Sequence, residues 1–353
     1  MAAASASRAL LPAPEEYNQS AAAGHWPLLL PLFYYTHLSK TGGSSFVEDA
    51  PRFTGLSRCG DVHCGGDTSN AGNISLPSMG EFWERTKSCN FIACEGSLEE
   101  NIKHLADGSK AAGRLLSRRP RSHLHMLREP HTHILSMYGH CQTRTDSPSA
   151  SMYEPIGFEE WLALAAEQTN CPPPCKALRK YCAYNPHNFQ TRRLGSSSEN
   201  WLADLQAAKR EVSEAGYIGL LEHYALSLCV LAKAVDGVAP DKCRCAATAW
   251  SDVPPVSAEA HRISPLPAVK HVLTPWQVGA NDINHNSHPE TVAVSKNATH
   301  LINTRLAVAD IQLYAFALAR FEHDAAAAGM GCWLKDEAGL RRALKIKLPH
   351  DAA

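Results

Sequence analysis

The sequence lacks a long hydrophobic run and an excess of charge of either sign. No stretch of about 18 consecutive apolar residues occurs in the 353-residue chain, so the sequence predicts no membrane-spanning helix. Lys and Arg number 34 against 35 Asp and Glu, which leaves no overall field to attract nucleic acid or an anionic membrane. We therefore expect no nucleic-acid partner, and membrane association only if an N-terminal anchor is missing from this chain.

Several signatures of common chemistry are absent as well. The chain has no Cys-x-x-Cys pair and no His-Glu-x-x-His helix, which are frequent marks of zinc proteins. It has no Gly-x-x-x-x-Gly-Lys-[Ser/Thr] loop, so an ordinary ATPase or kinase is disfavoured. What the chain does have is an ordinary globular composition, 44% hydrophobic and 20% charged, which predicts a packed domain of enzyme size.

Twelve cysteines are more than a typical cytosolic chain carries, and they favour an oxidising compartment. Buried free thiols are the alternative, because spacing alone does not fix which cysteines pair. Asn18, Asn73 and Asn297 begin Asn-x-Ser/Thr patterns typical of glycoproteins, although so short a motif also arises by chance.

Short apolar runs alternate with helical patterns along the chain. This alternation predicts an α/β fold, in which a central parallel sheet is flanked by helices. A last amphipathic helix is expected over 301–327. The expected strands are 32–36, 90–94, 123–127 and 217–221.

Composition also divides the chain into regions. Residues 1–25 are rich in Ala, Ser and Pro and predict a flexible arm, and residues 26–330 then form a single domain. Within it, stretches of about 54–80 and 236–297 have little periodicity and are expected to be variable insertions. Residues 331–353 are expected to form a C-terminal tail.

The first expected strand ends in a loop suited to bind an anion. Two glycines allow a tight turn that brings backbone N–H groups close to a phosphate, and the following helix adds unpaired donors and partial positive charge. Lysine adds a full charge and the hydroxyls add further donors. An ordinary Gly-Ser turn with a solvated lysine is the alternative. The loop residues are Lys40, Thr41, Gly42, Gly43, Ser44 and Ser45.

A second anion-binding pair follows the third expected strand. Arg128 leaves the end of that strand, Pro130 starts a helix, and Ser136 lies about two turns later. A guanidinium and a hydroxyl can thus converge on one phosphate.

Both segments resemble those of a known family. The string His37-Leu-Ser-Lys-Thr-Gly-Gly-Ser-Ser-Phe46 resembles the 5′-phosphosulfate loop of the carbohydrate sulfotransferases, of the heparan sulfate 2-O/6-O type and related Golgi enzymes. Leu127-Arg-Glu-Pro-His-Thr-His-Ile-Leu-Ser-Met-Tyr138 is similar to their 3′-phosphate segment, with Arg128 and Ser136 on the phosphate-binding positions. His133 stands where the family has a second Arg.

Three later segments agree with the family in order, so that the resemblance runs from about residue 32 to about residue 321. The stretches 54–80 and 236–297 have no counterpart in it and are the expected places for acceptor recognition. The three segments are Asn188–Leu194, Tyr217–Tyr224 and Asp310–Phe316.

The resemblance implies a P-loop NTPase-like sulfotransferase fold. It implies 3′-phosphoadenosine-5′-phosphosulfate (PAPS) as co-substrate, no metal, and transfer of a sulfuryl group to a hydroxyl of a carbohydrate. Lys40 is then the cation at the leaving oxygen, and the family places the catalytic base beyond the second strand, where Glu95 stands. His63 and His37 are the alternatives, and Glu95 could instead only cap a helix.

The sequence is compatible with more than one compartment and more than one function. The family's animal members lie in the Golgi lumen, which the cysteines favour, whereas a chain without a membrane span could also be soluble in the cytoplasm. One alternative function is a non-catalytic protein that binds sulfated glycans. Another is a metal-binding protein, because His123 and His125 share a strand face as ligands might. The further residues that suggest a metal are His131, His133, His140 and Cys141.

Overall fold

The computed structural model describes eight parts of the chain and builds an α/β fold from them. The described residues are 31–58, 89–94, 121–142, 153–168, 176–195, 204–245, 294–336 and 340. Four parallel strands form one sheet in the order β2-β1-β3-β4, which confirms the predicted parallel sheet flanked by helices. The strands are β1 (Leu32–Thr36), β2 (Phe91–Cys94), β3 (Arg121–Leu127) and β4 (Tyr217–Leu220).

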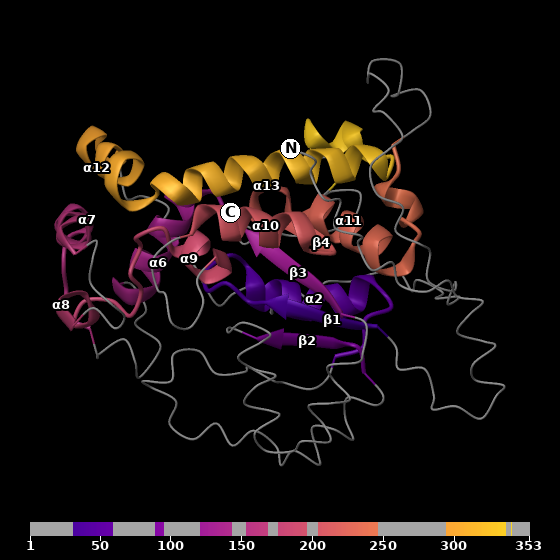
Figure 1. Ribbon diagram of the computed structural model, residues 1–353, viewed down its shortest axis with the longest axis horizontal. Helices are drawn as coiled ribbons and strands as arrows, with labels where there is room; N and C mark the ends of the chain where they lie inside the picture. The colour runs from indigo at the N-terminus through magenta and orange to yellow at the C-terminus, as the bar shows by residue number, and fades with distance from the viewer. Residues whose placement is uncertain are drawn as a thin grey trace, which may run out of the picture.

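The helices fill the intervals between and after these strands. The longer ones are α2 (Gly43–Phe53), α6 (Pro130–Gln142), α7 (Phe158–Glu167), α10 (Leu205–Glu214), α11 (Tyr224–Asp236) and α13 (Val308–Ala327). The shorter ones are α8 (Lys176–Arg179), α9 (Phe189–Gly195), α12 (Lys296–Leu301), η2 (Leu221–His223), η3 (Asp241–Cys243), η6 (Ile302–Leu306) and η7 (Gly331–Leu334). Figure 1 shows β2 and β4 at opposite edges of the sheet and α13 running across the β4 side, above α10 and α11.

The first face of the sheet, which carries Tyr35 and Tyr217, packs against α2 and α11. Side chains alternate between the faces of a strand, so every second residue of each strand points to these helices. From α2, the ring of Phe46 lies 4.5 Å from that of Tyr35 and 5.9 Å from that of Tyr217. From α11, the Ser227 carbonyl accepts a hydrogen bond from the Tyr217 hydroxyl at 2.9 Å. The helix that begins in the Lys-Thr-Gly-Gly loop is thus fixed on this face.

The second face of the sheet carries His123 and His125 and packs against α10. Glu211 of α10 reaches both histidines. Helix α13 contacts α10 and β4, and Arg320 of α13 donates to the Ala215 carbonyl just beyond α10 at 2.7 Å. The sheet is therefore covered on both faces, as a buried parallel sheet requires.

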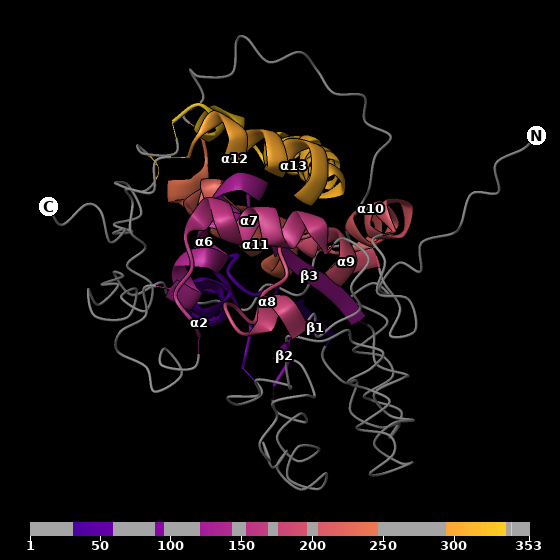
Figure 2. The ribbon, with the colours of Figure 1, turned by 90° about the vertical axis from the view of Figure 1, so that its left-hand side faces the viewer.

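A second apolar cluster lies beside the sheet, where α6 meets α7, α8, α12 and η6. Its centre is Trp161, which is fully buried together with Leu162 and Met137. The helical spacing of the α7 aromatics predicts core positions, and their burial confirms it. In Figure 2, α7 and α8 face the viewer and α12 lies above them, next to α13.

Helices α9 and α13 cap each other. Asn188, just before α9, accepts at Oδ1 from the N–H groups of Ala309 (2.8 Å) and Asp310 (3.3 Å) in α13. Asp310 in turn accepts from the N–H groups of Gln190 (3.2 Å) and Thr191 (2.7 Å) in α9. Each helix start thus receives the side-chain acceptor that its unpaired N–H groups need.

This capping explains a difference from the expected helix over 301–327. The structure contains α12 and η6 first, and α13 begins only at Val308, after Ala307 with φ −121°. The apolar spacing continues through residue 307, so sequence periodicity does not reveal the break. The acceptor that caps α13 comes from Asn188, more than a hundred residues earlier.

Three disulfides join pairs of cysteines that both lie within the described residues. They are Cys141–Cys182, Cys229–Cys243 and Cys245–Cys332. Such pairs are consistent with a protein of the secretory pathway, as the cysteine content predicts. Within the described residues, no helix has the length and apolarity needed to cross a membrane.

The predicted region boundaries are only partly within the described residues. The arm at 1–25 and most of the insertions at 54–80 and 236–297 lie outside them. The first residues of the expected tail at 331–353 form η7, where Cys332 is bonded to Cys245. The domain division stays a prediction.

Candidate functional site

The candidate site lies at the carboxyl edge of the sheet, where all four parallel strands end. Strand β1 is central, with β2 on one side and β3 on the other. The chain therefore leaves β1 at a point where the strand order reverses, and such switch points are where open α/β sheets bind ligands. The loop of residues 37–42 follows β1, and Arg128 follows β3, so the two predicted anion-binding segments flank this point.

The loop has the backbone that a tight turn requires. Lys40 and Gly42 both have positive φ, at 69° and 79°. Gly42 is the N-cap of α2, and a Cβ on Gly43 would overlap the ring of His37, so a side chain does not fit there. Left-handed backbone at a lysine is uncommon, and conformations of this kind concentrate at ligand sites.

The predicted donors of the loop differ in what they can offer. Thr41 is fully buried and its hydroxyl donates to the Leu38 carbonyl at 2.8 Å, so that hydroxyl serves the turn itself. The N–H groups of Gly43, Ser44 and Ser45 precede the first intrahelical hydrogen bond of α2, which Phe46 donates. Ser44 is exposed and Ser45 half-buried. The start of α2 therefore presents backbone N–H groups and two hydroxyls.

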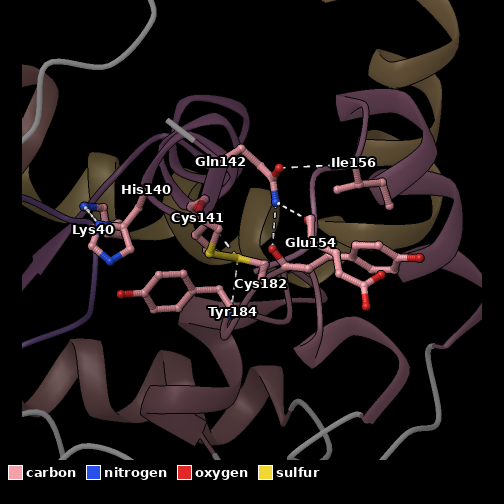
Figure 3. Close-up of a disulfide and its surroundings, with 10 residues drawn as sticks. Lys40, His140, Cys141, Gln142, Glu154, Ile156, Cys182 and Tyr184 are labelled. Carbon is pink, nitrogen blue, oxygen red and sulfur yellow. Dashed lines mark hydrogen bonds between the residues drawn. A yellow bond between two sulfur atoms is a disulfide. The ribbon is translucent and has the colours of Figure 1, made fainter. Parts of the chain in front are cut away.

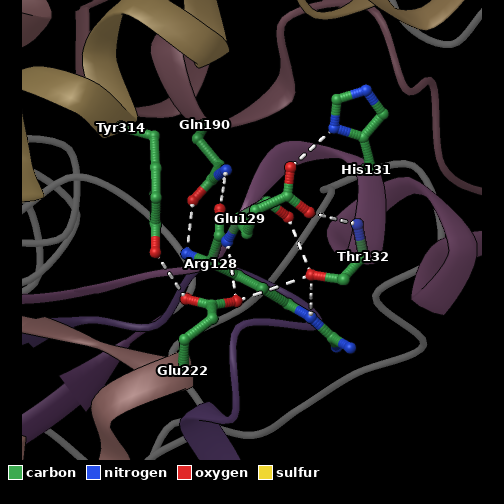
Figure 4. Close-up of polar contacts among 7 residues, drawn as sticks. All are labelled: Arg128, Glu129, His131, Thr132, Gln190, Glu222 and Tyr314. Carbon is green, nitrogen blue, oxygen red and sulfur yellow. Dashed lines mark hydrogen bonds and ion pairs between the residues drawn. The ribbon is translucent and has the colours of Figure 1, made fainter. Parts of the chain in front are cut away.

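Arg128 is held tightly against this loop. Gln190 clamps its backbone, because Gln190 Oε1 accepts from the Arg128 N–H at 2.9 Å and Nε2 donates to the Arg128 carbonyl at 2.8 Å. The guanidinium Nη1 donates to the Lys40 carbonyl at 3.1 Å. Nε donates to Thr132 Oγ1 at 3.2 Å (Figure 4). The two predicted segments, 88 residues apart, are thus in direct contact.

Two carboxylates surround Arg128. Glu222, after β4, accepts from the Glu129 N–H at 2.8 Å and from the Tyr314 hydroxyl at 2.9 Å. Glu129 accepts from the Thr132 N–H at 2.8 Å at the start of α6. Burial lowers the pKa of Arg128, and the two carboxylates oppose this effect, so the guanidinium keeps its charge. Figure 4 shows these groups gathered around the arginine.

The loop is supported from α6 by two histidines. His133, 1% exposed, donates from Nε2 to the Ser39 carbonyl at 2.9 Å. Burial, with the positive charges of Arg128 and Lys40 nearby, lowers the pKa of His133 to about 3, so the ring is neutral. The position where the sulfotransferases carry a second Arg thus holds an uncharged side chain that supports the loop.

The second histidine contacts the loop lysine. Lys40 Nζ donates to His140 Nδ1 at 3.2 Å, and the His140 ring lies 5.6 Å from that of Tyr184. Figure 3 shows that His140 directly precedes the Cys141–Cys182 disulfide, which joins the end of α6 to the segment that carries Tyr184.

Ser136 lies on the same face of α6 as these histidines. It follows His133 by three residues and precedes His140 by four, the spacings that share one helix face. Its side chain is buried, with 2% exposed. The spacing therefore places Ser136 toward the loop.

Of the three candidates for the catalytic base, His37 is within the described residues. Glu95 and His63 lie outside the described residues. Cys94 at the end of β2 pairs with Thr36 at the end of β1, so β2 ends at the same edge of the sheet as the loop. His37 is buried beneath the loop, with its ring stacked 6.0 Å from that of Tyr35.

Three residues of the site had no role in the sequence analysis, namely Gln190, Glu222 and Tyr314. All three belong to segments quoted for the family resemblance, which was the available signal for them. The contact partners of all three lie more than sixty residues away.

Comparison with known proteins adds no relative. No family model, no curated protein and no solved structure matches this chain.

Proposed function

We propose that this chain is a sulfotransferase that moves a sulfuryl group from PAPS to a hydroxyl, most suitably on a carbohydrate. The observation that carries the proposal is the contact of Arg128 with the Lys40 carbonyl at the strand-order reversal. Two anion-binding segments meet there, and PAPS is a nucleotide with anionic groups at both ends. The sheet would then belong to a P-loop NTPase-like sulfotransferase fold.

Each of the two segments is suited to bind one part of PAPS. The N–H groups at the start of α2, with Ser44 and Ser45, suit the 5′-phosphosulfate, because a helix N-terminus favours an anion. Arg128 suits the 3′-phosphate, since a guanidinium binds phosphate oxygens through a fork of N–H groups. Ser136 adds a hydroxyl on the same side. The Gln190 clamp keeps the arginine at the end of β3.

In the proposed reaction the acceptor oxygen attacks sulfur and forms the new S–O bond. The S–O bond to the 5′-phosphate breaks, and adenosine 3′,5′-bisphosphate leaves with the bond electrons on its phosphate oxygen. Lys40 neutralises the charge that develops on that oxygen. Glu95 takes the acceptor proton, with His63 and His37 as the alternatives. No step needs a metal.

The proposed acceptor and compartment rest on separate observations. Loops over a cleft select the substrate in most α/β folds, so the stretches 54–80 and 236–297 are proposed to bind the glycan. The disulfides support a secretory route. The Golgi lumen is proposed because the family that the motifs resemble works there.

Titration calorimetry with adenosine 3′,5′-bisphosphate tests the proposal. We expect binding by the wild type and a loss of about 10- to 100-fold in Arg128→Ala and Lys40→Ala, because each removes a charged hydrogen-bond donor. Arg305→Ala and Lys296→Ala are matched controls, since both side chains are exposed on other helices. The proposal fails if the wild type does not bind, or if the site variants bind as the controls do.

A further inference from the structure

Two histidines and a glutamate converge on the second face of the sheet, away from the proposed donor loop. His123 and His125 are two residues apart on β3, so they point to the same side. Glu211 comes from α10, and its Oε1 lies 2.6 Å from His123 Nδ1 and 2.9 Å from His125 Nε2. Among the described residues, this is the group of His, Cys, Asp and Glu side chains whose ligand atoms lie within 4.8 Å of one another.

The spacing of these three atoms is close to that of a metal site. Zinc binds histidine nitrogen and carboxylate oxygen at about 2.0–2.2 Å, so neighbouring ligands of a tetrahedral ion lie roughly 3.4 Å apart. The two oxygen-to-nitrogen distances here, 2.6 and 2.9 Å, are those of direct hydrogen bonds and are shorter than this by about 0.8 and 0.5 Å. A small outward movement of the Glu211 carboxylate would make room for an ion in place of the two hydrogen-bonded protons.

The surroundings permit an ion to enter. His123 and Glu211 are each about a quarter exposed, at 24% and 27%, whereas His125 is buried at 1%. Within the described part of the chain, His125 Nδ1 has no hydrogen-bond partner, so it can take the proton that Nε2 would give up. Arg320 is the nearby positive group, and its charge is balanced by Asp324 at 3.3 Å.

We propose that His123, His125 and Glu211 form a zinc site, with water as the fourth ligand, that fastens α10 to β3. Two imidazoles and a carboxylate with an open position are a common zinc ligand set. The site is separate from the proposed sulfuryl transfer, because it lies on the second face of the sheet, whereas the donor loop lies at the carboxyl edge and α2 on the first face. The inference does not rest on the proposed function.

The test uses the full chain, stripped with a chelator and dialysed. After zinc is added back, mass spectrometry should find about one zinc ion per wild-type chain. Titration of the stripped protein with Co²⁺, followed by visible absorption, should give the same stoichiometry. Zinc should also raise the melting temperature by about 5 °C. His123→Ala and Glu211→Gln should lose the ion, the absorption band and the shift in melting temperature.

The controls make each outcome decisive. His123→Gln can keep a hydrogen bond to Glu211 and preserve the fold, yet it removes the imidazole ligand, so it should also lose the ion. His300→Ala removes an exposed histidine from α12 and should bind as the wild type does. The site is refuted if the wild type binds well below one ion per chain, or if a folded His123→Gln retains the ion. Nucleotide binding by the stripped protein should be unchanged, which separates this test from that of the proposed function.

Discussion

His133 should make the fold sensitive to acid, and the size of the effect can be worked out. Its pKa is about 3 in the folded chain, against an ordinary value of 6.5. Above about pH 6.5 the ring is neutral in both states, so it adds no pH dependence. Between about pH 6.5 and about pH 3, His133 is protonated in the unfolded chain and neutral in the folded chain. The free energy of unfolding therefore falls by about 1.4 kcal/mol for each pH unit below about 6.5. At about pH 5 the loss is roughly 2 kcal/mol.

Urea unfolding at about pH 7 and about pH 5 measures this effect in the wild type and in His133→Gln. The glutamine amide can still donate to the Ser39 carbonyl but does not titrate, so the variant should lose roughly 2 kcal/mol less stability on acidification. Burial also lowers the pKa values of His125 and His187, so the difference between the two proteins is the relevant quantity. Equal losses in both proteins would show that His133 can accept a proton in the folded state.

Two further predictions concern the proposed catalysis and the arginine clamp. Glu95→Gln should lower the turnover of PAPS by about 100-fold or more with nucleotide binding intact, as the loss of a general base does; near-normal turnover would place the base elsewhere. Gln190→Leu should lower the free energy of unfolding by about 2–4 kcal/mol, because it leaves the N–H and the carbonyl of Arg128 unpaired. Gln190→Leu should also weaken binding of adenosine 3′,5′-bisphosphate, whereas Gln190→Glu, which keeps the acceptor for the N–H, should retain more of both. An unfolding curve like that of the wild type would contradict the clamp.

The sequence predicted the sheet and its loop because both are local features. Each strand is a short apolar run, and the turn after β1 depends on residues that are consecutive in the sequence. The positive φ of Lys40 and Gly42 agrees with a turn that glycines allow. The resemblance and the position of Pro130 predicted that Arg128 and Ser136 converge on one phosphate, whereas the contact of Arg128 with the loop was not predicted.

The contacts that surround these residues were not predictable in the same way. Glu211 meets His123 and His125 across more than 80 residues, and no pattern in α10 distinguishes Glu211 from other exposed acids. The role of His133 depends on its burial, since a solvated histidine at that position would carry charge at mildly acidic pH. The disulfide pairing likewise depends on the tertiary fold.

The reciprocal caps of α9 and α13 have a consequence for how the protein opens. Asn188 accepts a hydrogen bond from an N–H group at the start of α13, and Asp310 does the same for α9. If either helix frays at that end, the N–H groups of the other helix therefore lose their acceptor. The two segments should therefore exchange their amide hydrogens as one cooperative unit. Gln190 belongs to this unit, so local melting of the C-terminal helix would release the backbone of Arg128 before the sheet itself unfolds.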